Sequence, residues 1–176
     1  MHLSCRVVPG VPTLRRPAVL DVVRRLVRAL PQRGVRVVSY TVMGNHVHLV
    51  VTAASREAMG DAMRYFFGLA ARRINAVLGR SGRLWSERYA CRCLRNARQA
   101  WHALNYALRN AAAAGVPVPR GGWDRYTGVD PGAIEQTRFL RSVFGFGRPL
   151  RALLLDMGCI KRPFRPLAQR LQLALF

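Results

Sequence analysis

Two histidines placed two residues apart are the feature of the sequence that most clearly suggests chemistry. His46 and His48 lie in the run Asn45-His46-Val47-His48-Leu49-Val50-Val51, whose apolar and β-branched residues are typical of a strand. Because side chains alternate across a sheet, the two imidazoles share one face, with their Cα atoms roughly 6 to 7 Å apart. Two imidazoles at this spacing can bind one metal ion, and a pair of surface or hydrogen-bonded histidines has the same spacing.

A tyrosine and an asparagine on a predicted helix are candidates to complete such a site. Asn96 is a suitable N-cap for a helix that we expect to reach about Ala113, and Tyr106 and Asn110 lie one turn apart on it. We interpret the Oδ1 atom of Asn110 as a third metal ligand and Tyr106 as a nucleophile that attacks a phosphodiester. The ion would polarise the phosphate oxygens, and a phenol needs that help because little phenolate exists at neutral pH. An amphipathic core or interface tyrosine would occupy the same position.

The elements that must position these residues follow a simple order. Strands are predicted at residues 3–8, 35–43, 46–52 and 84–94, and helices at residues 17–30, 55–78 and 97–113. The first six elements match the split βαβ, ferredoxin-like arrangement of an α+β fold, a four-stranded antiparallel sheet with two helices on one face. Val47 and Leu49 would pack under those helices, so the histidines face the other side. We expect the helix that carries Tyr106 to cover that side, because an uncovered apolar sheet face is a liability.

The chain divides into three predicted parts. Residues 1–115 form the ferredoxin-like catalytic domain, and residues 116–130 form a linker that is rich in proline and glycine. Residues 131–176 form a basic helical C-terminal extension, with short helical patterns near 131–144, 148–157 and 166–175.

The charge of the chain indicates a polyanionic partner. The 176 residues carry a formal net charge of +21, and Lys161 is the one lysine, so arginine supplies the other 28 of the 29 basic residues. A surface this basic repels itself unless a polyanion offsets it, and arginine both forks onto phosphates and stacks on bases. Nucleic acid is therefore the expected partner. The side chains that we expect to contact it are Arg83, Arg88, Arg92 and Arg95, with Trp85 available to stack on a base.

Several other classes of protein are not indicated. No apolar run approaches the roughly 18 residues that a membrane helix needs, and Met1 to Arg15 is no signal peptide, so we expect a cytoplasmic protein that does not contact a membrane. The cysteines form no C-x-x-C pair, which argues against a zinc ribbon and favours small buried thiols in a reduced compartment. These cysteines are Cys5, Cys91, Cys93 and Cys159.

These residues together resemble the single-tyrosine HUH transposases, and among them the REP-associated tyrosine transposases. The run Val42-Met43-Gly44-Asn45-His46-Val47-His48-Leu49-Val50-Val51 resembles the His-hydrophobic-His motif of that family. Gly82-Arg83-Leu84-Trp85 through Arg88-Tyr89, followed by Asn105-Tyr106-Ala107-Leu108-Arg109-Asn110, resembles its later blocks. Order and spacing agree over about residues 1–115. Two positions depart from the pattern, since relatives often have proline at Gly44 and, after the asparagine, at Ala111.

The resemblance implies an enzyme that uses Mg²⁺ or Mn²⁺ to cleave and rejoin single-stranded DNA near a hairpin. It implies His46, His48 and Asn110 as metal ligands and Tyr106 as the nucleophile that forms a 5′-phosphotyrosine and releases a 3′-hydroxyl. Such a transposase would act in a bacterial cytoplasm, in association with the nucleoid. The sequence leaves open whether the site is completed within one chain or across a homodimer.

Other functions compete with this interpretation. A ferredoxin-like sheet is also the architecture of RNA-recognition modules, although the aromatic strand signature of those modules is missing here. A non-catalytic or domesticated protein that binds hairpin nucleic acid would keep the same fold. A histidine-triad phosphoesterase would need a third histidine where Val50 stands. The eight acidic residues show no clustering of the kind that a two-metal carboxylate transposase requires.

Overall fold

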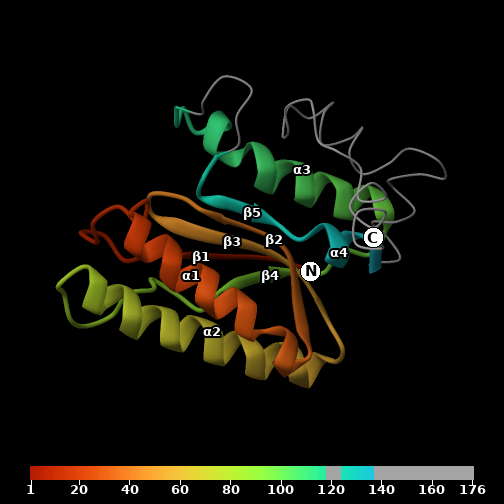
Figure 1. Ribbon diagram of the computed structural model, residues 1–176, viewed down its shortest axis with the longest axis horizontal. Coiled ribbons are helices and arrows are strands. Elements are labelled where there is room, and N and C mark those ends of the chain that lie inside the picture. Colours follow the sequence, from red (N-terminus) through yellow and green to blue (C-terminus); the bar gives the residue numbers. More distant parts are fainter. Residues whose placement is uncertain (118–123, 137–176) are drawn as a thin grey trace, which may run out of the picture.

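A five-stranded antiparallel sheet lies between two layers of helices in the computed structural model, which describes residues 1–117 and 124–136 (Figure 1). The strands are β1 (His2–Arg6), β2 (Val35–Val42), β3 (His46–Ala53), β4 (Ala90–Arg92) and β5 (Thr127–Val129). The helices are α1 (Pro17–Ala29), α2 (Arg56–Val77), α3 (Ala97–Ala113) and α4 (Pro131–Gln136), with a short 3-10 helix, η1 (Pro31–Arg33). The strand order is β4-β1-β3-β2-β5, so the first four strands have the ferredoxin-like arrangement that the sequence predicts.

Helices α1 and α2 cover one face of the sheet, as their apolar stripes predict (Figure 1). Pro17 occupies the first turn of α1, where the missing backbone N–H costs nothing. The Ser55 hydroxyl caps α2 by accepting a hydrogen bond from the Ala58 backbone N–H. Leu49 of β3 is fully buried against these helices, which confirms the side of the sheet assigned to the apolar set.

Helix α3 covers the opposite face and is held there by small residues and one buried hydrogen bond. Its alanines pack with Leu104 against Val38 and Val50 of the sheet. The Thr41 hydroxyl on β2 donates to the Ala107 carbonyl at 2.7 Å. Since Thr41 is paired with His48 across β2 and β3, this bond fixes α3 directly beside the second histidine of the pair.

The predicted fourth strand is shorter than expected. Only Ala90–Arg92 forms β4, and Trp85 makes an isolated pairing with Val7. The Arg83 guanidinium donates to the Trp85 and Ser86 carbonyls, and the Ser86 N–H donates to the Arg6 carbonyl. These local bonds satisfy the backbone in place of a continuous ladder with β1, so the segment bends before pairing resumes.

Part of the predicted linker belongs to the sheet. Thr127–Val129 is β5, which pairs with β2 and extends the predicted four strands to five. Asp124 holds its start in place, since both carboxylate oxygens accept hydrogen bonds from the Arg15 guanidinium, at 2.6 and 3.1 Å. The Tyr126 hydroxyl donates to the Arg15 carbonyl, so the two segments are tied at several points. The helices predicted near 148–157 and 166–175 lie outside the described residues.

The cysteines differ in part from the prediction. Cys5 is buried, but Cys91 on the edge strand β4 and Cys93 directly after that strand are exposed, and Cys159 lies outside the described residues. No helix in the described part of the chain is both long enough and apolar enough to cross a lipid bilayer.

Candidate active site

Two neighbouring strands bring three imidazoles to the face of the sheet that α3 covers. His46 and His48 lie on β3, and in the antiparallel register with β1 they are opposite Arg6 and Ser4. Residues opposite one another point to the same side, and alternate residues along a strand do too. His2, two positions before Ser4, therefore joins the two predicted histidines.

The tyrosine on α3 meets these imidazoles as the sequence predicts. The ring centroids of His46 and His48 are 4.6 Å apart, and that of Tyr106 lies 5.4 Å from His48, in an edge-on arrangement. The Tyr106 side chain is half exposed, at 50%, although it is a large aromatic residue. A tyrosine that served only core packing would be buried, so this one is accessible to a substrate.

Hydrogen bonds at the Nδ1 atoms orient both histidines of the pair. The Nδ1 atom of His46 lies 2.7 Å from the Asn45 Oδ1 atom, and the Nδ1 atom of His48 lies 3.2 Å from the Nε2 atom of His2. An amide oxygen only accepts, so Nδ1 of His46 carries the proton and its Nε2 keeps a lone pair. Nε2 of His48 is buried and has no hydrogen-bond partner among the described residues.

The electrostatic environment keeps these rings neutral at physiological pH. The pKa of His48 is lowered to about 3, first by burial and then by the imidazoles of His46 and His2, against the opposite effect of a hydrogen bond to the Leu3 backbone. Burial and the Arg6 guanidinium lower the pKa of His46. Metal ligation needs the neutral ring, so the site presents lone pairs rather than positive charges.

Asn110 is the predicted third ligand, and it lies on the same side of the sheet. Leu104 clusters with Val50 of β3, and Ala107, one turn later, bonds to Thr41, which is paired with His48. From Leu104 to Asn110, α3 therefore runs from the level of Val50 toward the level of His46. Asn110 is only 7% exposed, and its Nδ2 atom finds no acceptor in the part of the chain that the structure describes. Rotating the amide by half a turn exchanges Nδ2 and Oδ1, which would present an oxygen at that position.

This donor set fits a divalent cation. The His48 imidazole and the Asn110 amide each have a buried polar atom with no partner among the described residues, and such atoms are costly unless a ligand satisfies them. Amide oxygen is a donor that suits both Mg²⁺ and Mn²⁺, and imidazole nitrogen is a donor that suits first-row transition ions, so this set favours Mn²⁺ over Mg²⁺. In residues 1–117 and 124–136 no three His, Cys, Asp or Glu side chains are grouped to hold a metal ion, and the predicted third donor is an amide instead.

Of the side chains predicted to contact DNA, Arg92 shares a groove with the tyrosine. Arg92 is opposite His2 in the pairing of β1 with β4, so its side chain belongs to the same face. It lines a groove of about 440 Å³ beside the tyrosine ring. The other residues of the groove are His2, Leu94, Gln99, His102, Ala103 and Tyr106. Arg95 is exposed just before α3, where its backbone N–H donates to the Gln99 side chain.

The remaining predicted contacts lie elsewhere. The Trp85 indole N–H donates to the Phe67 carbonyl of α2 at 2.9 Å, and its ring packs edge-on against Phe67. Arg83 bonds to the backbone of its own turn, and Arg88 lies over the Tyr89 ring. The structure therefore does not bring these three side chains to the tyrosine groove.

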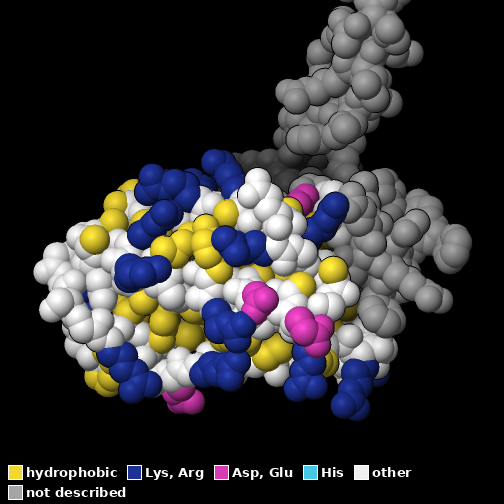
Figure 2. Space-filling view, turned by 90° about the horizontal axis from the view of Figure 1, so that it is seen from below, with side chains coloured by type: hydrophobic (Ala, Val, Ile, Leu, Met, Phe, Trp, Pro, Cys, Tyr) yellow, Lys and Arg dark blue, Asp and Glu magenta, His cyan; other side chains and the backbone are white. Residues whose placement is uncertain are grey.

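Arginines are also spread over the α1–α2 face, where acidic side chains are few (Figure 2). Exposed arginines on these two helices are Arg25, Arg28, Arg56, Arg64, Arg72 and Arg73. This face is separated from the histidines by the sheet, so its charge adds to the general attraction for a polyanion and not to the site itself.

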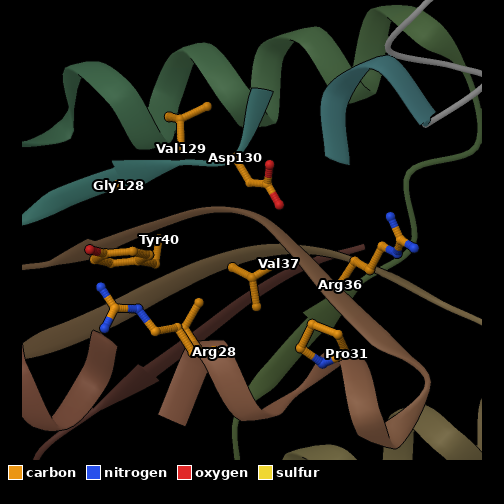
Figure 3. Close-up of a pocket in the computed structure, with 9 residues that line it drawn as sticks. Arg28, Pro31, Arg36, Val37, Tyr40, Gly128, Val129 and Asp130 are labelled. Atoms are coloured by element: carbon orange, nitrogen blue, oxygen red, sulfur yellow. The ribbon is translucent and has the colours of Figure 1, made fainter. Parts of the chain in front are cut away.

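A second hollow, of about 560 Å³, lies between α1, β2 and β5 (Figure 3). Tyr40 lies flat over Gly128, and a Cβ atom at position 128 would come within 2.2 Å of the tyrosine ring. Arg28 and Asp130 line the same hollow. Tyr40 and Thr41 are consecutive on β2, so their side chains point to opposite faces of the sheet. Thr41 is paired with His48, so this hollow and the histidines lie on opposite faces.

His2 is the site residue that the sequence did not reveal. It lies 44 positions before His46, with no spacing that links them, and only the register of β1 on β3 brings it into the site. Its ring stacks on His48 with centroids 5.2 Å apart and meets Tyr106 edge-on at 6.0 Å. Burial lowers its pKa, with smaller effects of the N-terminal charge and Arg92.

Comparison with known proteins agrees with this geometry. The family model described as "Transposase IS200 like" matches residues 13–106, more than half of the chain, and the match includes His46, His48 and Tyr106. No curated protein matches the chain at a significant level.

Two solved structures are similar to the chain. One is a REP-associated tyrosine transposase bound to a REP hairpin, with a TM-score of 0.53 and 14% identity, over 66% of this chain and 68% of the other. The other is a candidate transposase from Deinococcus radiodurans, with a TM-score of 0.45 and 23% identity, over 58% of this chain and 84% of the other. The first likeness confirms the fold, and the family match, which covers more than half of the sequence, shows that the chain belongs to the IS200-like transposases.

Proposed function

We propose that the chain is a metal-dependent transposase that cleaves and rejoins single-stranded DNA at hairpins through Tyr106. The observation that carries this proposal is the meeting of one exposed tyrosine with two neutral histidines on one face of the sheet. A family of transposases supplies the reaction class, which is DNA cleavage and transfer.

The reaction conserves the phosphodiester bond. The phenolic oxygen of Tyr106 attacks the phosphorus, the bond to the 3′ oxygen breaks, and the proton lost by the phenol is balanced by the proton gained by the leaving 3′-hydroxyl. A 5′-phosphotyrosine remains, and attack by another 3′-hydroxyl reverses the step and joins two strands without a nucleotide cofactor.

His46, His48 and Asn110 would hold the metal ion next to the tyrosine. A bound Mg²⁺ or Mn²⁺ would polarise the phosphate oxygens and neutralise the charge that develops on them. The hydrogen bond from His46 to Asn45 keeps the first imidazole in the tautomer that this role needs.

The substrate strand would pass along the groove beside Tyr106. Arg92 at one wall can contact a backbone phosphate, and side chains of α3, with His2 and Leu94, form the rest of the groove. The related structure that is bound to a REP hairpin supports hairpin DNA as the partner. Such a protein would act on the chromosome in the bacterial cytoplasm.

A suicide-substrate assay tests the proposal. Single-stranded hairpin DNA is incubated with Mn²⁺ and each variant, and the covalent protein–DNA adduct is counted on a denaturing gel. The wild type should form the adduct and Tyr106→Phe should form none, while Tyr89→Phe and Tyr126→Phe should retain it. His46→Ala should abolish the adduct and leave hairpin binding largely intact.

Two results would overturn the proposal in different ways. If Tyr106→Phe keeps the adduct and another tyrosine variant loses it, the nucleophile is misassigned. If the wild type binds the hairpin tightly and forms no adduct with any divalent ion, the chain is a non-catalytic hairpin-binding protein.

A further inference from the structure

Among the described residues, His2 makes the one side-chain hydrogen bond at the Nδ1 atom of His48, the buried histidine of the pair. Its Nε2 atom lies 3.2 Å from Nδ1 of His48, and the two rings are stacked with centroids 5.2 Å apart and planes 23° apart. Only one hydrogen can lie between these nitrogens, so one ring donates and the other accepts. The direction of that bond decides which nitrogen of His48 is free for the site.

The surroundings of His48 favour its Nδ1 atom as the donor. If His2 donated, the proton of His48 would be on Nε2, a buried atom with no acceptor among the described residues. A buried donor without a partner costs about 1–3 kcal/mol. A hydrogen bond to the Leu3 backbone also favours the protonated form of the His48 ring, and so raises its pKa against the larger effect of burial.

Both histidines of the pair are then oriented by a hydrogen bond at Nδ1, but the partner residue is of a different kind in each case. His46 is oriented by Asn45, its neighbour in sequence. His48 has no such neighbour, because Val47 and Leu49 point into the α1–α2 core, and the partner comes from β1 instead. With Nδ1 as the donor, each imidazole keeps a lone pair on Nε2.

We propose that His2 is a positioning residue that accepts the hydrogen bond from Nδ1 of His48 and fixes it in the tautomer whose Nε2 is a metal ligand. The part of this inference that concerns the ion rests on the proposed function. The part that concerns the tautomer is a property of the metal-free protein. The His2 ring also packs against both His48 and Tyr106.

The tautomer can be measured without any metal or DNA. Long-range ¹H–¹⁵N correlation spectra of the metal-free protein at neutral pH should show His48 with its proton on Nδ1. In His2→Leu, which removes the acceptor and keeps an apolar side chain of similar length, the spectrum should show a mixture of the two tautomers. His48 found with its proton on Nε2 in the wild type would overturn the proposal.

Binding of Mn²⁺ alone gives a second readout. Titration calorimetry of the full chain should show affinity about 10- to 100-fold weaker in His2→Leu than in the wild type, as is typical when the partner of a ligating histidine is lost. His2→Gln should recover most of the affinity, because its Oε1 is as many bonds from Cβ as Nε2 of histidine. His102→Leu is the matched control, since it removes another imidazole from the same groove, and it should bind Mn²⁺ as the wild type does.

The outcomes separate this inference from the proposed function. Equal Mn²⁺ affinity in His2→Leu and the wild type, with His46→Ala impaired, would overturn the role of His2 alone. Loss of affinity in His2→Leu that His2→Gln does not restore would indicate a packing role and would also contradict the proposal. If the wild type itself binds no Mn²⁺, the metal site of the proposed function fails, and the tautomer measurement still decides the role of His2. Circular dichroism and the midpoint of thermal unfolding show whether each variant is folded.

Discussion

At the scale of single residues, the site consists of groups that are poorly explained as parts of a stable core. Tyr106 is 50% exposed, and within the described ranges Nε2 of His48 and Nδ2 of Asn110 are buried without a hydrogen-bond partner. Residues selected only for stability tend to satisfy their polar atoms, and unsatisfied ones commonly mark functional sites. Substitution of Asn110 can therefore distinguish an effect on activity from an effect on stability.

Replacing Asn110 should therefore affect activity and stability in opposite directions. Asn110→Leu should bind Mn²⁺ weakly and form little adduct. Its thermal midpoint should equal or exceed that of the wild type, because the substitution removes a buried Nδ2 atom that has no acceptor among the described residues. Asn110→Asp, which keeps an oxygen donor, should retain adduct formation. A large fall in the thermal midpoint of Asn110→Leu, with normal adduct formation, would show that this residue has a structural role only.

Residue types and short spacings predicted much of this site. The His-x-His pair and the Tyr–Asn pair are local patterns, and their positions on a strand and a helix follow from periodicity. His2 and the environment of Trp85 are set by tertiary contacts. An aromatic residue in an arginine-rich segment looks available for base stacking, but Trp85 packs on Phe67, and nothing in its neighbours reveals that burial.

At the scale of elements, α3 and β5 decide whether the site forms. Helix α3 is attached through Thr41 and a small apolar cluster, and β5 extends the sheet beside β2. Sequence periodicity predicted α3 but not β5, because a three-residue strand that contains a glycine carries no readable alternation. The bond that organises β5, from Arg15 to Asp124, joins residues 109 positions apart.

The ion pair between Arg15 and Asp124 should make stability depend on pH. Burial alone would raise the pKa of Asp124, but hydrogen bonds from Arg15, the Tyr126 backbone and Thr127 together lower it below the usual 3.8. A carboxyl group with a lowered pKa in the folded state contributes stability that is present above the unfolded value and is lost as the pH falls through the folded value.

Asp124→Asn should accordingly cost about 3 kcal/mol of unfolding free energy at pH 7, typical of a broken buried ion pair. The difference from the wild type should shrink as the pH falls below 3.8, the usual value for this group. Urea unfolding at a series of pH values measures both. Asp61→Asn, which removes an exposed pair with Arg64, is the control and should cost less than about 1 kcal/mol. A pH-independent difference for Asp124→Asn would refute this account of the pair.

At the scale of the whole molecule, positive charge is spread over both faces, while the reactive groups are confined to one. The α1–α2 face is rich in arginine (Figure 2), and the pairing of β4 with β1 places Arg92 on the face that holds the histidines. General attraction and specific placement of DNA should therefore depend on different residues.

The salt dependence of DNA binding can distinguish these contributions. With the non-cleaving Tyr106→Phe variant, the logarithm of hairpin affinity should fall linearly with the logarithm of salt concentration. Arg92→Ala should reduce that slope by about 1, the effect of one lost phosphate contact. Arg73→Ala, on exposed α2 surface, should leave the slope unchanged. Equal effects of the two variants would place the DNA on both faces.

The site also predicts how many chains the reaction needs. The rings of His46, His48 and Tyr106 meet within a single chain, so we expect each chain to cleave with its own residues. A mixture of Tyr106→Phe and His46→Ala should then form no more adduct than either variant alone. Recovery of activity in the mixture would show that the tyrosine of one copy serves the histidines of another.

The most direct test of the central claim is to locate the DNA on the protein after cleavage. Each of the five tyrosines lies in a different peptide after trypsin digestion, because arginines separate them, and residues 99–109 contain only Tyr106. Mass spectrometry of the digested adduct should find the nucleotide on the 99–109 peptide, and only when Mn²⁺ or Mg²⁺ was present during the reaction. A nucleotide on any other tyrosine peptide, or an equal yield of adduct without a divalent ion, would contradict the account.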